Sequence, residues 1–180
     1  MKKLIVYFSF TNNNKLLSEH LTAYLDADIF RITEPHKRTD ILILMDILFN
    51  QTPKINPLAI DWSKYDHTIL IAPIYDYAIA HPMKTFIQQE KDNIGNYSFL
   101  TLCIGREGQK QKIINQLKIW LGRKPETVEE FLINDLVSPE QIEKIRYGSH
   151  YTIKEEEMKT FEPQIKATTA LISSASSISV

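Results

Sequence analysis

Three short apolar runs place the tightest limits on what this chain can fold into. They cover residues 4–8, 68–72 and 99–104, and polar side chains hardly interrupt them. Runs of this length are typical of strands that are covered on both faces, as in the middle of a parallel sheet. Two weaker strand candidates, residues 28–32 and 127–133, carry charged side chains and are expected at the edges of the sheet.

Helical patterns lie between these strands. Residues 16–25 and 113–121 repeat apolar side chains at helical spacing, so each segment would lay one stripe on a sheet. Residues 40–49, which read DILILMDILF, are apolar nearly all round and could equally support a strand. Thr39 as a cap and the need for a crossover connection favour a helix there.

Two further helices are predicted near the end of the chain. Ser138, Pro139 and Glu140 offer an N-cap, a proline at the first helical position and an acid in the first turn. The spacing of a capping box beginning at Thr152 predicts the last helix, whose apolar face would continue to residue 172. Pro163 lies off that face and is a candidate for a kink.

This alternation of strands and helices predicts an α/β fold with right-handed crossovers. Charged edges at the second and fifth strands fit a three-layer sandwich with a five-stranded parallel sheet of order 2-1-3-4-5 better than a six-stranded dinucleotide fold. We expect residues 1–173 to form a single domain and residues 174–180 to be a frayed, serine-rich tail.

Composition excludes several classes of function. The chain has 180 residues, a formal net charge of -1 and no clustered Lys or Arg, so nucleic acid is not an expected partner. No window approaches the ~18 apolar residues of a membrane span, so no membrane association is expected. The single cysteine, Cys103, cannot form an internal disulfide or a CxxC motif, which predicts a cytoplasmic protein.

The loop after the first strand is the most informative one for function. It holds Ser9, Phe10, Thr11, Asn12, Asn13 and Asn14 between a buried strand and the start of a helix. Free N–H groups and the helix dipole attract an anion at such a place, and hydroxyl and amide side chains add donors. Simple capping of the helix is the alternative. The loop has no GxGxxG and no GxxxxGK[ST], so a dinucleotide or a nucleoside triphosphate is not indicated.

Residues 7–16 resemble the phosphate loop of the flavodoxin family, which is usually written [ST]-x-T-G-x-T after the first strand. Ser9 and Thr11 match the two hydroxyl positions, and Asn14 stands where the last threonine would be. Asn12 replaces the glycine of the family. Asparagine is among the residues that best tolerate a left-handed backbone, so the geometry of the loop can survive this replacement.

Two further loops extend the resemblance. Residues 65–75, with 82–87, are similar to the third-strand segment of the family, in which Tyr75 matches the aromatic residue of the motif. We expect at least one of Tyr75 and Tyr77 to stack on the flavin. Asp76 and Tyr77 depart from the tryptophan and glycine of that motif. The third loop matches a family loop that is richer in Gly and Ser. The residues proposed for FMN in these two loops are Pro73, Ile74, Tyr75, Asp76 and Tyr77, and Gly105, Arg106 and Glu107.

The resemblance implies that the protein binds FMN noncovalently and acts in electron transfer or as a small flavin-dependent oxidoreductase. Its partner would then be a redox protein or a small-molecule electron acceptor. Two alternatives remain open: an NAD(P)H:quinone-type reductase on the same fold, and a degenerate flavodoxin-fold binding module without flavin, for which Tyr77 is one motive. Residues 40–49 are a candidate surface for a partner or for a homodimer. His81 is a candidate proton donor, and Cys103 is most simply a core residue.

Overall fold

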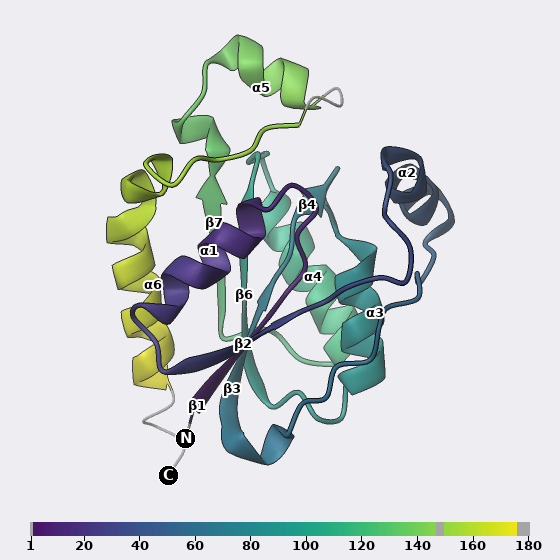
Figure 1. Cartoon of the computed structure of the whole chain (residues 1–180), viewed down its shortest axis with the longest axis vertical. Coiled ribbons are helices and arrows are strands. Elements are labelled where there is room, and N and C mark those ends of the chain that lie inside the picture. Colours follow the sequence, from purple (N-terminus) through teal and green to yellow (C-terminus); the bar gives the residue numbers. More distant parts are fainter. Residues whose placement is uncertain (1, 147–149, 176–180) are drawn as a thin grey trace.

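A five-stranded parallel sheet forms the centre of the molecule (Figure 1). The computed structural model describes residues 2–146 and 150–175. The strands are β1 (Lys2–Tyr7), β2 (Ala27–Arg31), β3 (Tyr65–Ile71), β6 (Asn96–Cys103) and β7 (Thr127–Leu132). They lie in the order β2-β1-β3-β6-β7, and every neighbouring pair is parallel. Counted along the chain this is the order 2-1-3-4-5, so the predicted fold class is confirmed.

Helices cover both faces of the sheet, which makes three layers. On one face α1 (Asn13–Thr22) and α6 (Glu162–Ala175) pack over one core cluster. On the other face α3 (His81–Glu90) and α4 (Gln109–Leu121) pack over a second cluster. Leu4 belongs to one cluster and its neighbour Ile5 to the other, because successive side chains of a strand point to opposite faces.

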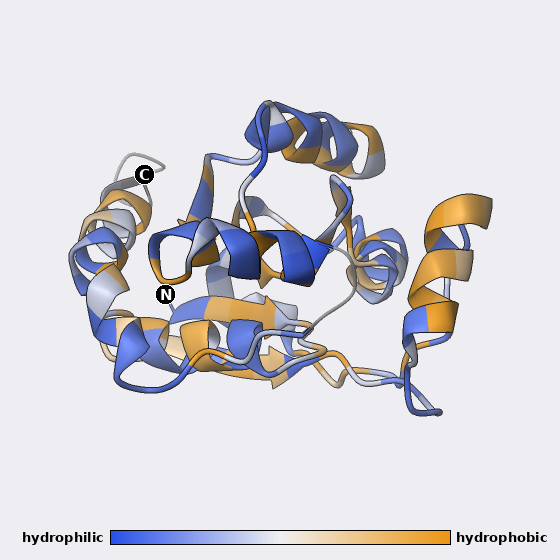
Figure 2. Cartoon of the chain, turned by 90° about the horizontal axis from the view of Figure 1, so that it is seen from above, coloured by the Kyte–Doolittle hydropathy of each residue, from blue (hydrophilic) through white to orange (hydrophobic). Residues whose placement is uncertain are grey.

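Residues 40–49 form a helix, α2 (Asp40–Phe49), as predicted. The Thr39 side chain caps it, since its Oγ1 accepts a hydrogen bond from the N–H of Leu42 at 3.4 Å. The helix stands away from the sheet, at the right-hand side of Figures 1 and 2, and Figure 2 shows it almost entirely in the hydrophobic colour. No helix among the described ranges is long and apolar enough to cross a bilayer.

The short helix near the end begins as expected, whereas the last helix does not. In α5 (Pro139–Arg146) the Oγ of Ser138 accepts from the N–H of Gln141. The prediction that the last helix begins at Thr152 is wrong. The 3-10 segment η3 (Glu157–Phe161) comes first, and α6 begins at Glu162. Pro163 therefore lies in the first turn, where its missing N–H costs no hydrogen bond, and it does not kink the helix.

The remaining elements are short. Two of them are the 3-10 segments η1 (Trp62–Lys64) and η2 (Ile133–Asp135). The others are β4 (Ile74–Tyr75) and β5 (Ala78–Ile79), which form a separate antiparallel hairpin. Helix α6 includes residues 174 and 175, and the rest of the expected tail lies outside the described residues.

Candidate functional site

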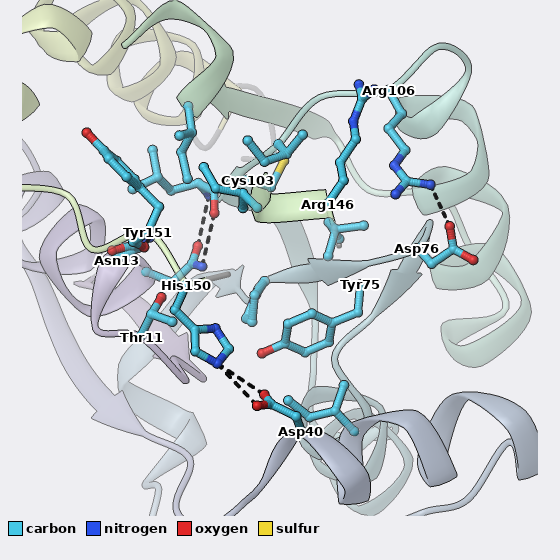
Figure 3. Close-up of a pocket in the computed structure, with 18 of the residues that line it drawn as sticks. Thr11, Asn13, Asp40, Tyr75, Asp76, Cys103, Arg106, Arg146, His150 and Tyr151 are labelled. Carbon is cyan, nitrogen blue, oxygen red and sulfur yellow. Dashed lines mark hydrogen bonds and ion pairs between the residues drawn. The ribbon is translucent and has the colours of Figure 1, made fainter. Parts of the chain in front are cut away.

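A cavity of about 650 Å³ opens where the strands of the sheet end (Figure 3). Its walls include segments that directly follow the carboxyl ends of β1, β3, β6 and β7, together with α2 and Ile145, Arg146, His150 and Tyr151. In open α/β sheets this edge is the usual ligand site, next to the point where the strand order reverses. The order reverses between β1 and β3, so the cavity lies at the position that the topology favours.

The first loop leaves the start of α1 without a side-chain cap. Asn12 takes a left-handed conformation, with φ 67° and ψ -3°, and its side chain caps no N–H group. The first helical hydrogen bond is made by the N–H of Leu16 to the Asn12 carbonyl, at 3.0 Å. The N–H groups of residues 13–15 precede that bond and have no partner inside the helix. They and the positive end of the helix dipole form a place for an anion.

The loop also carries two side-chain hydroxyls, those of Ser9 and Thr11. The Ser9 side chain is buried, and its Oγ has no hydrogen-bond partner within the described residues. Thr11 lines the cavity itself. A buried hydroxyl without a partner costs about 1–3 kcal/mol.

The asparagine side chains at the start of α1 have a different role from the expected one. Asn14 bonds Leu102 twice, through Nδ2 to the carbonyl at 3.3 Å and through Oδ1 from the N–H at 2.9 Å. Asn13 donates to the Tyr151 carbonyl at 2.8 Å and accepts from the N–H of Ile153 at 3.0 Å. These amides therefore fasten the loop to distant segments, and what remains for an anion is the backbone of these residues.

The second loop is the β4–β5 hairpin, and the two residues of its turn are placed differently relative to the cavity. Asp76 and Tyr77 occupy the turn with φ 44° and 69°, both positive, as in the tight turns that join right-twisted strands. Tyr75 lines the cavity, while Tyr77 does not. The centroid of the Tyr77 ring instead lies 3.5 Å from the Lys112 Nζ and 5.4 Å from the Arg106 guanidinium carbon.

Tyr75 is one of the aromatic residues that line the cavity, together with His150 and Tyr151 (Figure 3). Its Oη is buried without a hydrogen-bond partner in the part of the chain that the structure describes. Burial raises the pKa of the Tyr75 phenol well above its ordinary value, so the group is a neutral donor at physiological pH. Pro73 and Ile74 line the cavity beside it.

The third loop is tied to the hairpin and to the segment after β7. Arg106 Nη1 lies 2.6 Å from the Asp76 Oδ1, and both residues line the cavity. The Gly105 N–H donates to Asn134 Oδ1 at 2.7 Å. A Cβ at Gly105 would lie 2.8 Å from a terminal methyl of Leu132, so the bare backbone lets that side chain pack closely.

Eight of the sequence-predicted residues therefore line one cavity, and six do not. The eight are Thr11, Asn13, Asn14, Pro73, Ile74, Tyr75, Asp76 and Arg106. The six that lie outside the lining are Ser9, Phe10, Asn12, Tyr77, Gly105 and Glu107. Tyr77 and Glu107 line a smaller neighbouring cavity of about 420 Å³, which also includes Arg106.

Sequence reasoning missed two walls of the site. Helix α2 contributes Asp40, Ile43, Leu44 and Ile47 to the lining, and the segment after α5 contributes His150 and Tyr151. These walls meet directly, because His150 Nε2 lies 3.2 Å from Asp40 Oδ1 (Figure 3). The Phe10 ring packs edge-on against the His150 ring at 5.3 Å. The apolar character of residues 40–49 was the one signal available, and it does not say what the helix faces.

The thiol in the cavity is not a nucleophile. Burial raises the pKa of the Cys103 thiol to about 12, and the Gln109 side-chain amide donates to its sulfur at 3.3 Å. The thiol therefore stays protonated at physiological pH. His81, unlike Cys103, does not line the cavity, so the structure gives no support to its role as a proton donor there.

Comparison with solved structures identifies the fold as flavodoxin-like. A flavoprotein from Lactobacillus acidophilus, solved in complex with FMN, is 22% identical, with a TM-score of 0.64 over 72% of this chain and 92% of that one. A Fusobacterium nucleatum flavodoxin bound to flavin mononucleotide is 15% identical, with a TM-score of 0.50 over 97% of this chain and 99% of that one. No family model matches the sequence, and no curated protein is significantly similar to it. The likeness at these identities is one of fold.

Proposed function

We propose that this chain binds FMN noncovalently in the cavity at the carboxyl edge of the sheet, and that it acts in electron transfer or as a small flavin-dependent oxidoreductase. One observation carries the proposal: an uncapped helix N-terminus and the half-buried ring of Tyr75 line the same cavity. The volume of about 650 Å³ falls within the roughly 300–1,000 Å³ typical of cofactor and ligand sites.

The phosphate end of FMN fits the first loop. The N–H groups of residues 13–15 and the Thr11 hydroxyl supply donors, and the buried Ser9 hydroxyl, free of any partner among the described residues, lies at the start of the same loop. No basic side chain of this loop is needed, because the helix terminus itself favours a dianion. Asn13 and Asn14 hold the loop in position through their bonds to distant backbone groups.

The ring end of FMN fits the opposite wall. Tyr75 offers a flat aromatic surface, and Pro73, Ile74 and Ile104 make this region apolar. When bound, the flavin supplies the redox chemistry, whereas the chain supplies binding, orientation and the local charge.

A titration of the apoprotein tests the proposal. We expect FMN fluorescence to be quenched at low micromolar protein. We expect Thr11→Val to weaken FMN by roughly tenfold or more, the value of a hydrogen bond to a charged group, with little effect on riboflavin, which lacks the phosphate. Thr22→Val is the matched control, because Thr22 lies at the other end of α1 and its hydroxyl bonds only the Glu19 carbonyl. Equal losses for FMN and riboflavin would contradict a phosphate role for the loop.

The same titration separates the alternatives. Tyr77 was the motive for a flavin-free binding module, and its ring lies outside the cavity lining, against Lys112. If high micromolar protein leaves FMN fluorescence unchanged, the binding module becomes the better description. If the loaded protein oxidises NAD(P)H steadily without a partner reductase, the quinone-type reductase does.

A further inference from the structure

Helix α2 exposes an unusual amount of apolar surface. A helix that is apolar nearly all round is normally buried, yet α2 has six large apolar side chains between 39% and 72% exposed. They are Ile41, Leu42, Leu44, Met45, Leu48 and Phe49. By contrast, Ile119 on α4 and Leu171 on α6 are exposed singly, as is common on any protein surface.

The helix is attached to the rest of the molecule by polar groups. Asp46 is the one residue of α2 that is buried in the described structure. The Nη1 atom of Arg38 lies 2.6 Å from the Asp46 Oδ2. Arg38 also binds Glu34 through two hydrogen bonds of 2.6 Å. At the end of the helix, Lys84 Nζ donates to the Asn50 carbonyl at 2.9 Å. Ion pairs and hydrogen bonds thus hold the helix to the body of the molecule, while most of its apolar side chains stay exposed.

The six exposed side chains form one continuous face, which we call the α2 outer face. At 100° per residue they fall within an arc of roughly 160°. The two acidic residues of the helix lie off this arc, since Asp46 binds Arg38 and Asp40 pairs with His150. Ile43 and Ile47 lie off it too; they line the cavity, as does Leu44 at the edge of the arc. The α2 outer face is therefore uncharged, and it belongs to a helix that stands at one side of the molecule (Figure 2).

We propose that the α2 outer face is the interface for a second copy of this chain, in a two-fold symmetric dimer with the two α2 helices packed against each other. A two-fold interface must be complementary to itself, and a face without charges meets its own copy without repulsion. The six side chains expose on the order of 600 Å² per chain, taking about 100–200 Å² for a large apolar side chain. A standard interface buries about 800 Å² per partner, so a polar rim around the helix completes it.

The position of α2 permits this contact. Figures 1 and 2 show the helix standing out at one side of the molecule, so a second copy can approach it without meeting the sheet or the other helices. Two antiparallel helices also place opposite ends of their dipoles together. Because α2 is a wall of the cavity as well, the dimer would lie beside the ligand site without filling it.

Sedimentation equilibrium of the full chain, with and without FMN, tests the proposal. We expect a dimer at micromolar concentration, and we expect Ile41→Glu to weaken dimerisation by roughly 30-fold or more, as for the loss of a central interface residue. Ile119→Glu is the matched control, because Ile119 is 78% exposed and Ile41 72%. Circular dichroism verifies that both variants are folded. A monomeric wild type at 100-fold higher concentration, about 10⁻⁴ M, or a dimer unaffected by Ile41→Glu, would overturn the proposal.

A cross-linking experiment locates the contact. Met45 lies near the middle of the α2 outer face, close to where a two-fold axis would pass, so Met45→Cys is expected to give a disulfide-linked dimer under mild oxidation. Cys103 gives no background, because it is buried and its thiol stays protonated. Ile119→Cys is expected to remain uncross-linked. Binding of the monomeric chain to anionic phospholipid vesicles, lost in Ile41→Glu, would replace the second copy by a membrane surface and overturn the proposal.

Discussion

Arg38 and Asp46 form a buried ion pair, with 2.6 Å between Nη1 and Oδ2, that fixes α2 to the body of the protein. Their side chains are 6% and 7% exposed. We expect Asp46→Ala to lower the free energy of unfolding by about 2–4 kcal/mol, because it leaves a buried guanidinium with Glu34 alone. Urea unfolding measures this. Asp61→Ala is the control: it removes a surface ion pair with Lys64 and should hardly change the free energy of unfolding. An equal loss of stability in both variants would show that burial of the ion pair does not matter.

Asn14 acts as a substitute for strand pairing at the end of β6. The pairing of β3 with β6 ends at Ile71 and Leu100, and beyond it Asn14 bonds both backbone groups of Leu102. We expect Asn14→Leu to cost about 2–4 kcal/mol of stability, since it leaves two buried polar groups unpaired. Asn115→Leu is the control, because Asn115 bonds only the exposed side chain of Gln111.

This variant also separates support of the loop from contact with a ligand. In Asn14→Leu, stability and FMN affinity should fall together, as measured by urea unfolding and by FMN titration. In Thr11→Val, only FMN affinity should fall, because the structure gives Thr11 a place in the cavity lining and no supporting bond of that kind. A loss of affinity in Asn14→Leu at unchanged stability would mean that the amide contacts the ligand.

The sheet was predictable because burial on both faces leaves a local signal. The run at residues 4–8 lacks alternation since Leu4 and Ile5 both lie in a core, on opposite faces, and β1 is an inner strand. The hairpin at Ile74–Ile79 gave no such signal. Its turn holds Asp76 and Tyr77, both with positive φ, and Tyr77 stands at the position where sequence rules look for glycine.

The site was predictable only in part, because each loop follows one strand in the sequence, whereas the cavity walls are formed by segments far apart in the sequence. The left-handed conformation of Asn12 was expected from the tolerance of asparagine. The partners of the next two asparagines lie 138 and 88 residues away, so no local pattern could show that their amides are engaged. The same holds for the contact of Asp40 with His150, which joins two segments 110 residues apart.

The buried imidazole of His67 makes stability depend on pH. It is 2% exposed and its Nε2 lies 3.0 Å from the Ser98 Oγ. Burial, together with the positive charge of Lys3, lowers the pKa of His67 to about 4 and outweighs the Asp66 carboxylate, which acts to raise it. The Glu126 carboxylate, 3.5 Å from Nδ1, is one-third exposed to water. The unfolded chain, with an ordinary pKa of about 6.5, binds the proton first, so stability is complete above that pH and falls toward pH 4.

We therefore expect the free energy of unfolding to drop by about 1–2 kcal/mol between pH 7 and pH 5, measured in urea. His67→Gln, which keeps a polar side chain without a titration in this range, should remove most of this drop. Burial also lowers the pKa of His81, so His81→Gln should remove a further part. A full drop in the His67→Gln variant would show that the pH dependence comes from other groups.

The pair of Asp76 and Arg106 should set the reduction potential of bound FMN, if the cavity holds it as proposed. The two charges lie 2.6 Å apart at the cavity wall and largely cancel each other. A reduced flavin carries more negative charge, so Asp76→Asn should raise the potential and Arg106→Gln should lower it, each on the order of tens of millivolts. Both shifts should shrink in high salt, because Asp76 is 69% exposed. Redox titration at two ionic strengths measures this, with Asp61→Asn near the opposite end of β3 as the control. Shifts of the same sign in both variants would contradict a charge effect and indicate a change in flavin position.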